Sequence, residues 1–256
     1  MSYFDSTFQL SLIVGLFTGT AAGYLGSFMI LKRMALVGDA LTHVALPGIG
    51  IAFLLNINPF IGAFVFLFVA ALIIWRLEQK TKLAVETLVG IMFTASLAIG
   101  ILITPEPELF EALFGDISKT KPIDAILAIV LAVIVTIIMR RIAKQLILGT
   151  VSEEFAKASG INISKINLIF LMLVSIIVAL GIKVVGSLLM GALVIIPAAT
   201  SKNISPNFRS FGFWSMVIGT LSTGLGVWIA FQYSLPPGPI VVLTSIVFFL
   251  ISLIKK

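Results

Sequence analysis

Nine long apolar runs, separated by charged residues or by Pro and Gly, occupy most of the chain. They cover residues 9–31, 36–55, 59–75, 84–104, 122–139, 166–182, 184–200, 211–231 and 238–254. Each run is about as long as the 17–25 residues that a helix needs to cross a bilayer. Only 11% of the 256 residues are charged, too few to cover the surface of a water-soluble fold. The runs therefore predict an all-α polytopic membrane bundle of eight to nine transmembrane helices.

The exact number of spans depends on residues 166–200. A single charged residue, Lys183, separates two apolar runs there, and 35 residues are too many for one crossing. Gly181 and Gly186 favour a tight turn between the runs. The segment is therefore expected to form either two full spans or a re-entrant hairpin.

The basic residues predict how the bundle is oriented. With nine spans and an external N-terminus, 14 of the 17 Lys and Arg residues fall on the cytoplasmic side, and only Lys119, Lys121 and Lys183 fall outside. Cytoplasmic loops carry such an excess of basic residues. The C-terminus is then expected to be cytoplasmic. Because topology accounts for the net charge of +6, we expect no nucleic-acid partner.

Residues 1–256 are expected to form a single transmembrane domain, because no sizeable polar region interrupts the runs. Two loops are long enough to have a role of their own. The loop at about 105–121 is acidic and is expected to be external. The loop on the cytoplasmic side contains a short polar segment that starts at Glu153, with Gly160 expected to end its helix. From spacing alone, that helix either docks a cytoplasmic partner or lies on the lipid headgroups.

Asp39 and His43 are the ionisable residues that lie well inside a predicted span. Their spacing of four residues places them on one face of a helix. A charged group inside the bilayer costs at least about 2.5–3.5 kcal/mol, which favours a functional role. Imidazole suits zinc, copper, iron or nickel, and a carboxylate adds affinity for manganese. The pair is therefore interpreted as part of a path for a metal cation, and the alternative is a polar pair that only holds helices together.

Pro47 follows in the same span and cannot donate a backbone hydrogen bond, so a bend is expected near residue 43. The freed carbonyl group is either a further oxygen ligand or only the consequence of the bend. In the first span, Gly15, Gly19 and Gly23 recur at four-residue spacing. Such a stripe of small residues is typical of close helix packing in membranes.

Several classes of protein are excluded by what the sequence lacks. It contains no Cys, so disulfides, thiolate metal sites and cysteine catalysis are absent. It contains no G-x-x-x-x-G-K-[ST] phosphate-binding loop and no hydrolase motif. The chain is therefore not expected to be an enzyme, and an ATPase that drives transport would be a separate subunit.

Three segments resemble motifs of the ABC-3 family of metal-ion permeases, the membrane subunits of manganese, zinc and iron importers. The first is Met34-Ala-Leu-Val-Gly-Asp-Ala-Leu-Thr-His-Val-Ala-Leu-Pro-Gly48, with Thr42 in place of a common serine. The second is Leu193-Val-Ile-Ile-Pro-Ala-Ala-Thr200. The third, Glu154-x-Ala156-x-x-x-Gly160, is similar to the coupling segment of the family.

The resemblance implies the partners and the fold. It implies a bundle similar to the vitamin B12 and siderophore importers, arranged as a homodimer with the ion path between the subunits. Each subunit would bind one cytoplasmic ATPase through residues 151–164, including Glu153, Glu154, Ala156 and Gly160. An extracellular or periplasmic metal-binding protein would deliver the ion. Asp39 and His43 match the metal-contacting residues of the family, and no permanently bound cofactor is implied.

Two other functions are compatible with parts of the sequence. One is an ATP-independent cation channel or secondary carrier that uses the Asp39–His43 pair. The other is a permease for vitamin B12 or siderophores, which carry bulkier substrates. In each case the chain lies in the plasma membrane of a bacterium or archaeon. Nothing in the sequence separates manganese from zinc.

Overall fold

The computed structural model describes residues 6–104, 113 and 121–254 and is helical throughout these ranges, with no strand. Its helices are α1 (Ser6–Leu31), α2 (Ala35–Val44), α3 (Leu46–Leu54), α4 (Pro59–Thr81), α5 (Val85–Ile103), α7 (Pro122–Val151), α8 (Glu153–Ala158), α9 (Ile163–Val185), α10 (Ser187–Ile204), α11 (Phe208–Gln232) and α12 (Pro237–Ile254). The predicted all-α class is confirmed.

Eight stretches within the described ranges are long and apolar enough to cross a bilayer. They comprise α1, the consecutive pair α2–α3, and helices α4, α5, α7, α9, α11 and α12. The prediction of eight to nine spans agrees with this number. Helix α10 has 18 residues and occupies the predicted run at 184–200, but it is not one of the eight. The ninth crossing therefore stays a prediction.

Residues 166–200 fold as two helices that meet at Gly186. This glycine has a φ angle of 81°, which residues with a side chain rarely adopt. Gly181 instead lies inside α9, where a Cβ atom would overlap the side chain of Met190. Of the two glycines expected at the turn, one forms it and the other makes room for a neighbouring helix.

Polar residues fix the starts of several helices. The side chains of Asn58, Asn162 and Asn207 accept hydrogen bonds from backbone N–H groups in the first turns of α4, α9 and α11, at 2.9, 3.0 and 2.9 Å. Pro59 and Pro122 occupy the first positions of α4 and α7. Proline suits this position because the first N–H groups of a helix have no partner within it.

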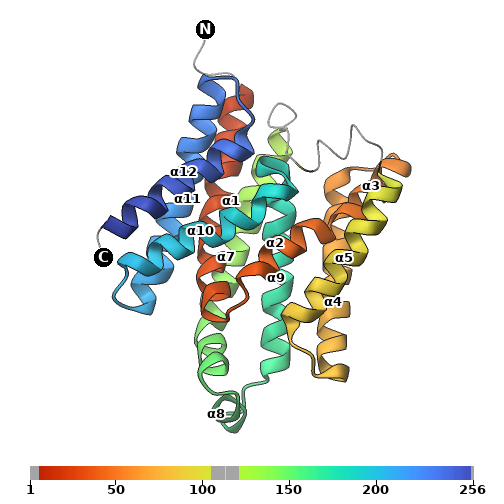
Figure 1. Cartoon of the computed structure of the whole chain (residues 1–256), viewed down its shortest axis with the longest axis vertical. Helices are drawn as coiled ribbons and strands as arrows, with labels where there is room; N and C mark the ends of the chain where they lie inside the picture. Colours follow the sequence, from red (N-terminus) through yellow and green to blue (C-terminus); the bar gives the residue numbers. More distant parts are fainter. Residues whose placement is uncertain (1–5, 105–112, 114–120, 255–256) are drawn as a thin grey trace.

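Helix α1 lies at the centre of the bundle, in contact with α7, α10 and α11 (Figure 1). Its glycines allow these neighbours to approach closely. A Cβ atom at Gly19 would lie 2.6 Å from the carbonyl oxygen of Gly219 on α11. A Cβ atom at Gly23 or Gly26 would overlap the backbone of α11 or α10. The packing role predicted for the glycine stripe is confirmed at Gly19 and Gly23, and Gly26 packs in the same way.

The outer helices expose large apolar side chains. Leu, Ile, Val and Phe residues with more than a third of their surface accessible are spread over α4, α5, α7, α11 and α12. Water-soluble folds rarely expose so extended an apolar surface, whereas a bilayer solvates it. This surface supports the interpretation of the chain as a membrane protein.

The span that contains the Asp39–His43 pair is broken in the middle. Helix α2 ends at Val44, and α3 begins at Leu46 with Pro47 in its first turn. Backbone N–H groups at this junction bond to the carbonyl oxygens of Thr42 and His43. The bend predicted from Pro47 is confirmed.

Several turns that carry basic residues lie at one end of the bundle. The α1–α2 turn with Lys32 and Arg33, the α4–α5 turn with Lys82, and α8 lie at the same end of the molecule, opposite the start of α1 (Figure 1). The acidic loop predicted at 105–121 lies outside the described residues apart from positions 113 and 121.

Candidate functional site

Helix α2 carries Asp39 and His43 one turn apart, as the sequence predicts. The buried face of α2 consists of Val37, Gly38, Leu41, Thr42 and Val44. Asp39 and His43 are both partly exposed, so they lie at the edge of this face.

Asp39 packs directly against α10. A Cβ atom at Gly191 would lie 2.5 Å from Oδ1 of Asp39 and 2.6 Å from its Cα atom. The backbone oxygen of Asp39 accepts a hydrogen bond of 2.6 Å from the hydroxyl group of Thr42. Gly191 therefore leaves the space that the carboxylate occupies, and any side chain at this position would displace Asp39. No pattern in the sequence links Gly191 to Asp39.

His43 lies against α5. Its ring is 5.4 Å from that of Phe93, centroid to centroid, at an interplanar angle of 64°. Its Nδ1 atom is buried and has no hydrogen-bond partner among the described residues. A buried polar atom is usually paired, so an unpaired one calls for an explanation. A nitrogen lone pair that is held in place and not used by the protein fits a ligand for a metal ion.

One chain supplies too few ligands for a closed metal site. Within the described part of the chain, no three His, Cys, Asp or Glu residues are grouped closely enough to hold an ion. Asp39 and His43 provide two ligands, whereas a closed zinc site usually has four. An ion at this pair would need water or groups from another molecule to complete its coordination.

The predicted coupling segment forms the short helix α8 at one end of the bundle (Figure 1). Ser152 caps its start by accepting a hydrogen bond from the N–H group of Phe155, at 3.2 Å. Glu153 and Glu154 lie in its first turn, where negative charge stabilises a helix. Glu153 also forms an ion pair of 2.8 Å with Lys157.

Helix α8 ends at Gly160 as predicted. Gly160 has a φ angle of 76°, and its N–H group donates to the carbonyl oxygen of Lys157. The N–H group of Ile161 donates to the carbonyl oxygen of Ala156, which completes a Schellman motif. Ala156 is fully buried, so it anchors α8 to the bundle.

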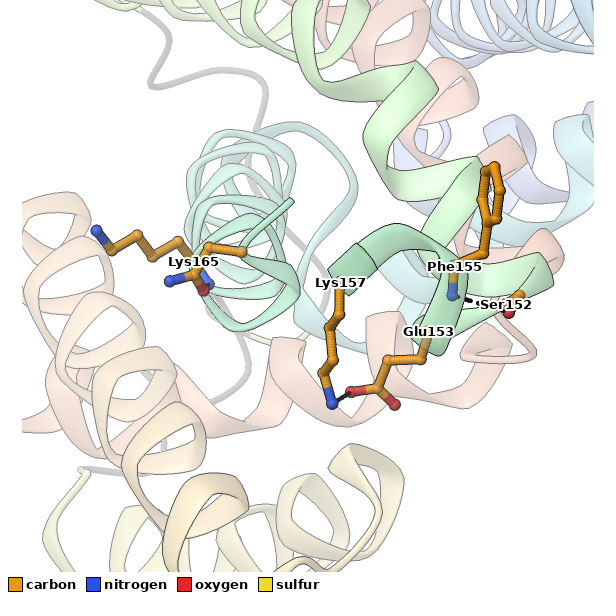
Figure 2. Close-up of polar contacts among 6 residues, drawn as sticks. Ser152, Glu153, Phe155, Lys157 and Lys165 are labelled. Atoms are coloured by element: carbon orange, nitrogen blue, oxygen red, sulfur yellow. Dashed lines mark hydrogen bonds and ion pairs between the residues drawn. The ribbon is translucent and has the colours of Figure 1, made fainter. Parts of the chain in front are cut away.

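The outward side of α8 combines charge with an apolar side chain. Phe155 is 61% exposed and points away from the ion pair of Glu153 and Lys157 (Figure 2). Glu154 is also exposed. The four residues predicted for partner coupling therefore divide into two groups. Glu153 and Glu154 lie at the surface, and Ala156 and Gly160 shape the helix.

The fold combines eight candidate membrane spans with the Asp39–His43 pair inside one span and the exposed helix α8 at one end. This combination defines a multi-pass membrane permease. The model of the ABC 3 transport family matches residues 5–256. The chain belongs to this family, as its motifs predict. It is thus the membrane subunit of an ABC transporter, and the ATPase and the substrate-binding protein are separate partners. Family membership argues against the ATP-independent channel or carrier.

Two relatives cover nearly the whole chain. The high-affinity zinc uptake system membrane protein ZnuB of Buchnera aphidicola subsp. Baizongia pistaciae is 34% identical over 256 residues, 98% of each chain. The manganese import system permease protein ScaB of Streptococcus gordonii is 32% identical over 248 residues, 95% of this chain and 89% of the relative.

Two solved structures have the same fold. PsaBC from Streptococcus pneumoniae, in complex with a Fab, matches with a TM-score of 0.85 and 31% identity over 97% of this chain and 91% of that chain. A metal-chelate-type ABC transporter in an inward-facing conformation matches with a TM-score of 0.79 and 19% identity over 97% and 86% of the two chains. The second likeness bears on the fold alone and agrees with the predicted importer architecture.

Proposed function

We propose that the chain is the permease of an importer for a divalent transition metal, manganese or zinc with iron as a third candidate. The relatives include permeases of zinc uptake and manganese import systems, which supports this range. The observation that carries the proposal is the Asp39–His43 pair inside a span, with Nδ1 of His43 left without a hydrogen-bond partner among the described residues. A bulky chelate would need a wider set of contacts than this pair provides.

The metal site is completed by a second copy of the chain. Because one chain offers two ligands, two copies related by a twofold axis would offer four. The contact of His43 with Phe93 places α5 beside the pair. The exposed residues of α5 include Thr87, Thr94 and Ala98, and small or hydroxyl side chains of this kind allow helices to approach closely in a membrane. This face of α5 is therefore the proposed contact between the subunits.

Helix α8 is the proposed docking element for the ATPase. It projects from the end of the bundle where the basic turns gather, which is the expected cytoplasmic side (Figure 1). Its exposed Phe155 would fill an apolar pocket, with Glu153 and Glu154 facing basic residues of the partner. The opposite end then faces outward and receives the ion from the binding protein. The whole chain, 1–256, acts as one permease domain in a bacterial or archaeal plasma membrane.

Uptake by reconstituted vesicles tests the function. The permease, co-expressed with its ATPase and supplied with the binding protein, should accumulate labelled manganese or zinc only when ATP is hydrolysed. Accumulation by the permease alone at the same rate would show that transport does not require the ATPase. Competition between the two ions would identify the substrate.

Reversing the charge of Glu154 should weaken ATPase binding. We expect Glu154→Lys to lower co-purification of the ATPase by roughly tenfold, because like charges would meet at the docking surface. Glu86→Lys is the matched control, since Glu86 is also exposed in the first turn of a helix at the same end of the bundle. Equal loss in both variants would assign the effect to net charge and not to α8.

Labelling of single cysteines should establish the orientation. The chain contains no cysteine, so the unmodified protein provides a blank background. We expect a membrane-impermeant maleimide to label Ile57→Cys, in the α3–α4 turn, from outside the cell. Ser159→Cys, at the end of α8, should react only after the membrane is opened. Labelling of both positions from the same side would contradict the proposed topology.

A further inference from the structure

A partly buried lysine connects the turn before α2 with α9. Lys32 directly follows the last residue of α1, and its Nζ atom donates a hydrogen bond of 2.5 Å to Oδ1 of Asn167. The same Nζ atom lies 5.6 Å from the ring centroid of Phe170, also on α9. Most surface lysines extend into water, so these two contacts hold the Lys32 side chain in an unusual position.

Lys32 borders a cavity of about 230 Å³ where four helices meet. The cavity wall includes Glu78 from α4, Gln145 from α7, Glu153 from α8 and Asn167 from α9. Glu78 and Asn167 line this cavity together, and the Oε2 atom of Glu78 is buried without a hydrogen-bond partner among the described residues. The turn that leads into α2 therefore meets the coupling helix at a shared polar cluster.

The charges in this cluster depend on one another. Burial lowers the pKa of the Lys32 ammonium group, and the carboxylates of Glu78 and Glu153 act in the opposite direction. A buried ammonium group loses much of its stabilisation when the opposite charges move away. Because Glu153 belongs to α8, the environment of Lys32 depends on the position of that helix.

The turn between α1 and α2 is constrained enough to transmit a displacement. The N–H group of Met34 donates to the carbonyl oxygen of Met29, and that of Arg33 to Ile30, so the turn is a Schellman motif. Arg33 has a φ angle of 60°. Met34 is buried, and Gly38 packs against the side chain of Met29. A movement of Lys32 would therefore carry the start of α2 with it.

We propose that Lys32 is a positioning residue that links the coupling helix α8 to the metal-carrying helix α2. The link runs from Glu153 across the shared cavity to the ammonium group of Lys32, which is held by Asn167 and begins the α1–α2 turn seven residues before Asp39. A displacement of α8 by the ATPase would change the position of Asp39 and His43. This inference rests on the proposed roles of α8 and of the Asp39–His43 pair.

The ratio of imported ions to hydrolysed ATP tests this link. The complete transporter is reconstituted with its ATPase and binding protein, and uptake of labelled manganese, or of zinc, is measured together with ATP hydrolysis. We expect Lys32→Met to lower this ratio by roughly tenfold, because the residue carries coupling between two sites. ATPase binding should persist. Lys32→Arg should restore most of the ratio, and Lys80→Met, an exposed lysine at the same end of the bundle, should leave it unchanged.

A second variant distinguishes coupling from structural damage. Asn167→Ala removes the acceptor of the Lys32 hydrogen bond and should lower the ratio in the same direction, whether or not Lys32→Met assembles. The double variant should be no worse than Lys32→Met alone, since both changes break one link. An unchanged ratio of imported ions to hydrolysed ATP in both single variants would overturn the inference. This holds also if uptake and hydrolysis fall together, because their ratio then stays the same. Absence of ATP-driven uptake in the unmodified transporter would instead contradict the proposed function.

Discussion

Replacement of Asp39 by Asn, or of His43 by Ala, should lower metal uptake by about 100-fold or more. Each change removes one of the two ligands that we propose for each chain, and no group of three or more His, Cys, Asp or Glu residues among the described residues could replace it. In a symmetric dimer, a single substitution removes two of the four protein ligands. The loss should therefore exceed the roughly 10–100-fold effects usual for residues that only orient a ligand. Uptake of labelled manganese and zinc, measured in vesicles with matched permease content, would detect it.

The control for these variants keeps the geometry of α2. Thr42→Ser retains the hydroxyl group that donates to the backbone oxygen of Asp39 and should transport at the normal rate. Both ligand variants should still bind the ATPase, because α8 lies at the end of the bundle. Normal uptake by either variant would reduce that residue to a packing element between helices.

The sequence predicts the two candidate ligands but not the residues that pack against them. Asp39 and His43 are recognisable because they are ionisable, four residues apart and inside an apolar run. Gly191 and Phe93 contact them from α10 and α5. These contacts join segments far apart in the chain, and a single sequence contains no information on which segments meet. The sequence does not distinguish Gly191 from the other glycines of the apolar runs.

The same limit applies to Lys32. In the sequence it is one of the basic residues predicted to lie in a cytoplasmic turn. Its position beside Asn167, and on the wall of one cavity with Glu78 and Glu153, depends on how α4, α8 and α9 come together. Features that depend only on the neighbouring backbone were predictable from the sequence. Gly160 ends α8, and Pro47 breaks the second span, because each acts on its own backbone.

The fold was predictable for a physical reason. The bilayer requires long apolar helices, so the runs of the sequence correspond closely to the observed helices. Which helices pack against each other depends, in contrast, on small residues that let two backbones approach closely. Gly19 and Gly23 on α1 meet Gly219 and Ser215 on α11. The glycine stripe indicated a close contact but not its partner helix.

A single methyl group at this contact should strongly destabilise the bundle. A Cβ atom at Gly219 would overlap the carbonyl oxygen of Gly19, which belongs to the backbone and has no side-chain freedom to move aside. Gly219→Ala should therefore separate α1 from α11 and cost about 1–3 kcal/mol, as overpacked cores do. Since about 1 kcal/mol corresponds to roughly 2–4 °C in a protein of this size, the melting temperature should fall by several degrees. Thermal unfolding in detergent would measure the change.

Gly224→Ala is the matched control on the same helix. Its added Cβ atom would approach only Cδ2 of Leu16, at 2.9 Å, and that methyl group can rotate away. Alanine is also favoured over glycine inside a helix by about 1 kcal/mol, so this variant should be as stable as the parent or slightly more stable. The propensity gain is the same at both positions, so the difference between the two variants isolates the clash with the Gly19 carbonyl. Equal melting temperatures would mean that α1 and α11 can separate at little cost, and that the close backbone contact is not what holds them together.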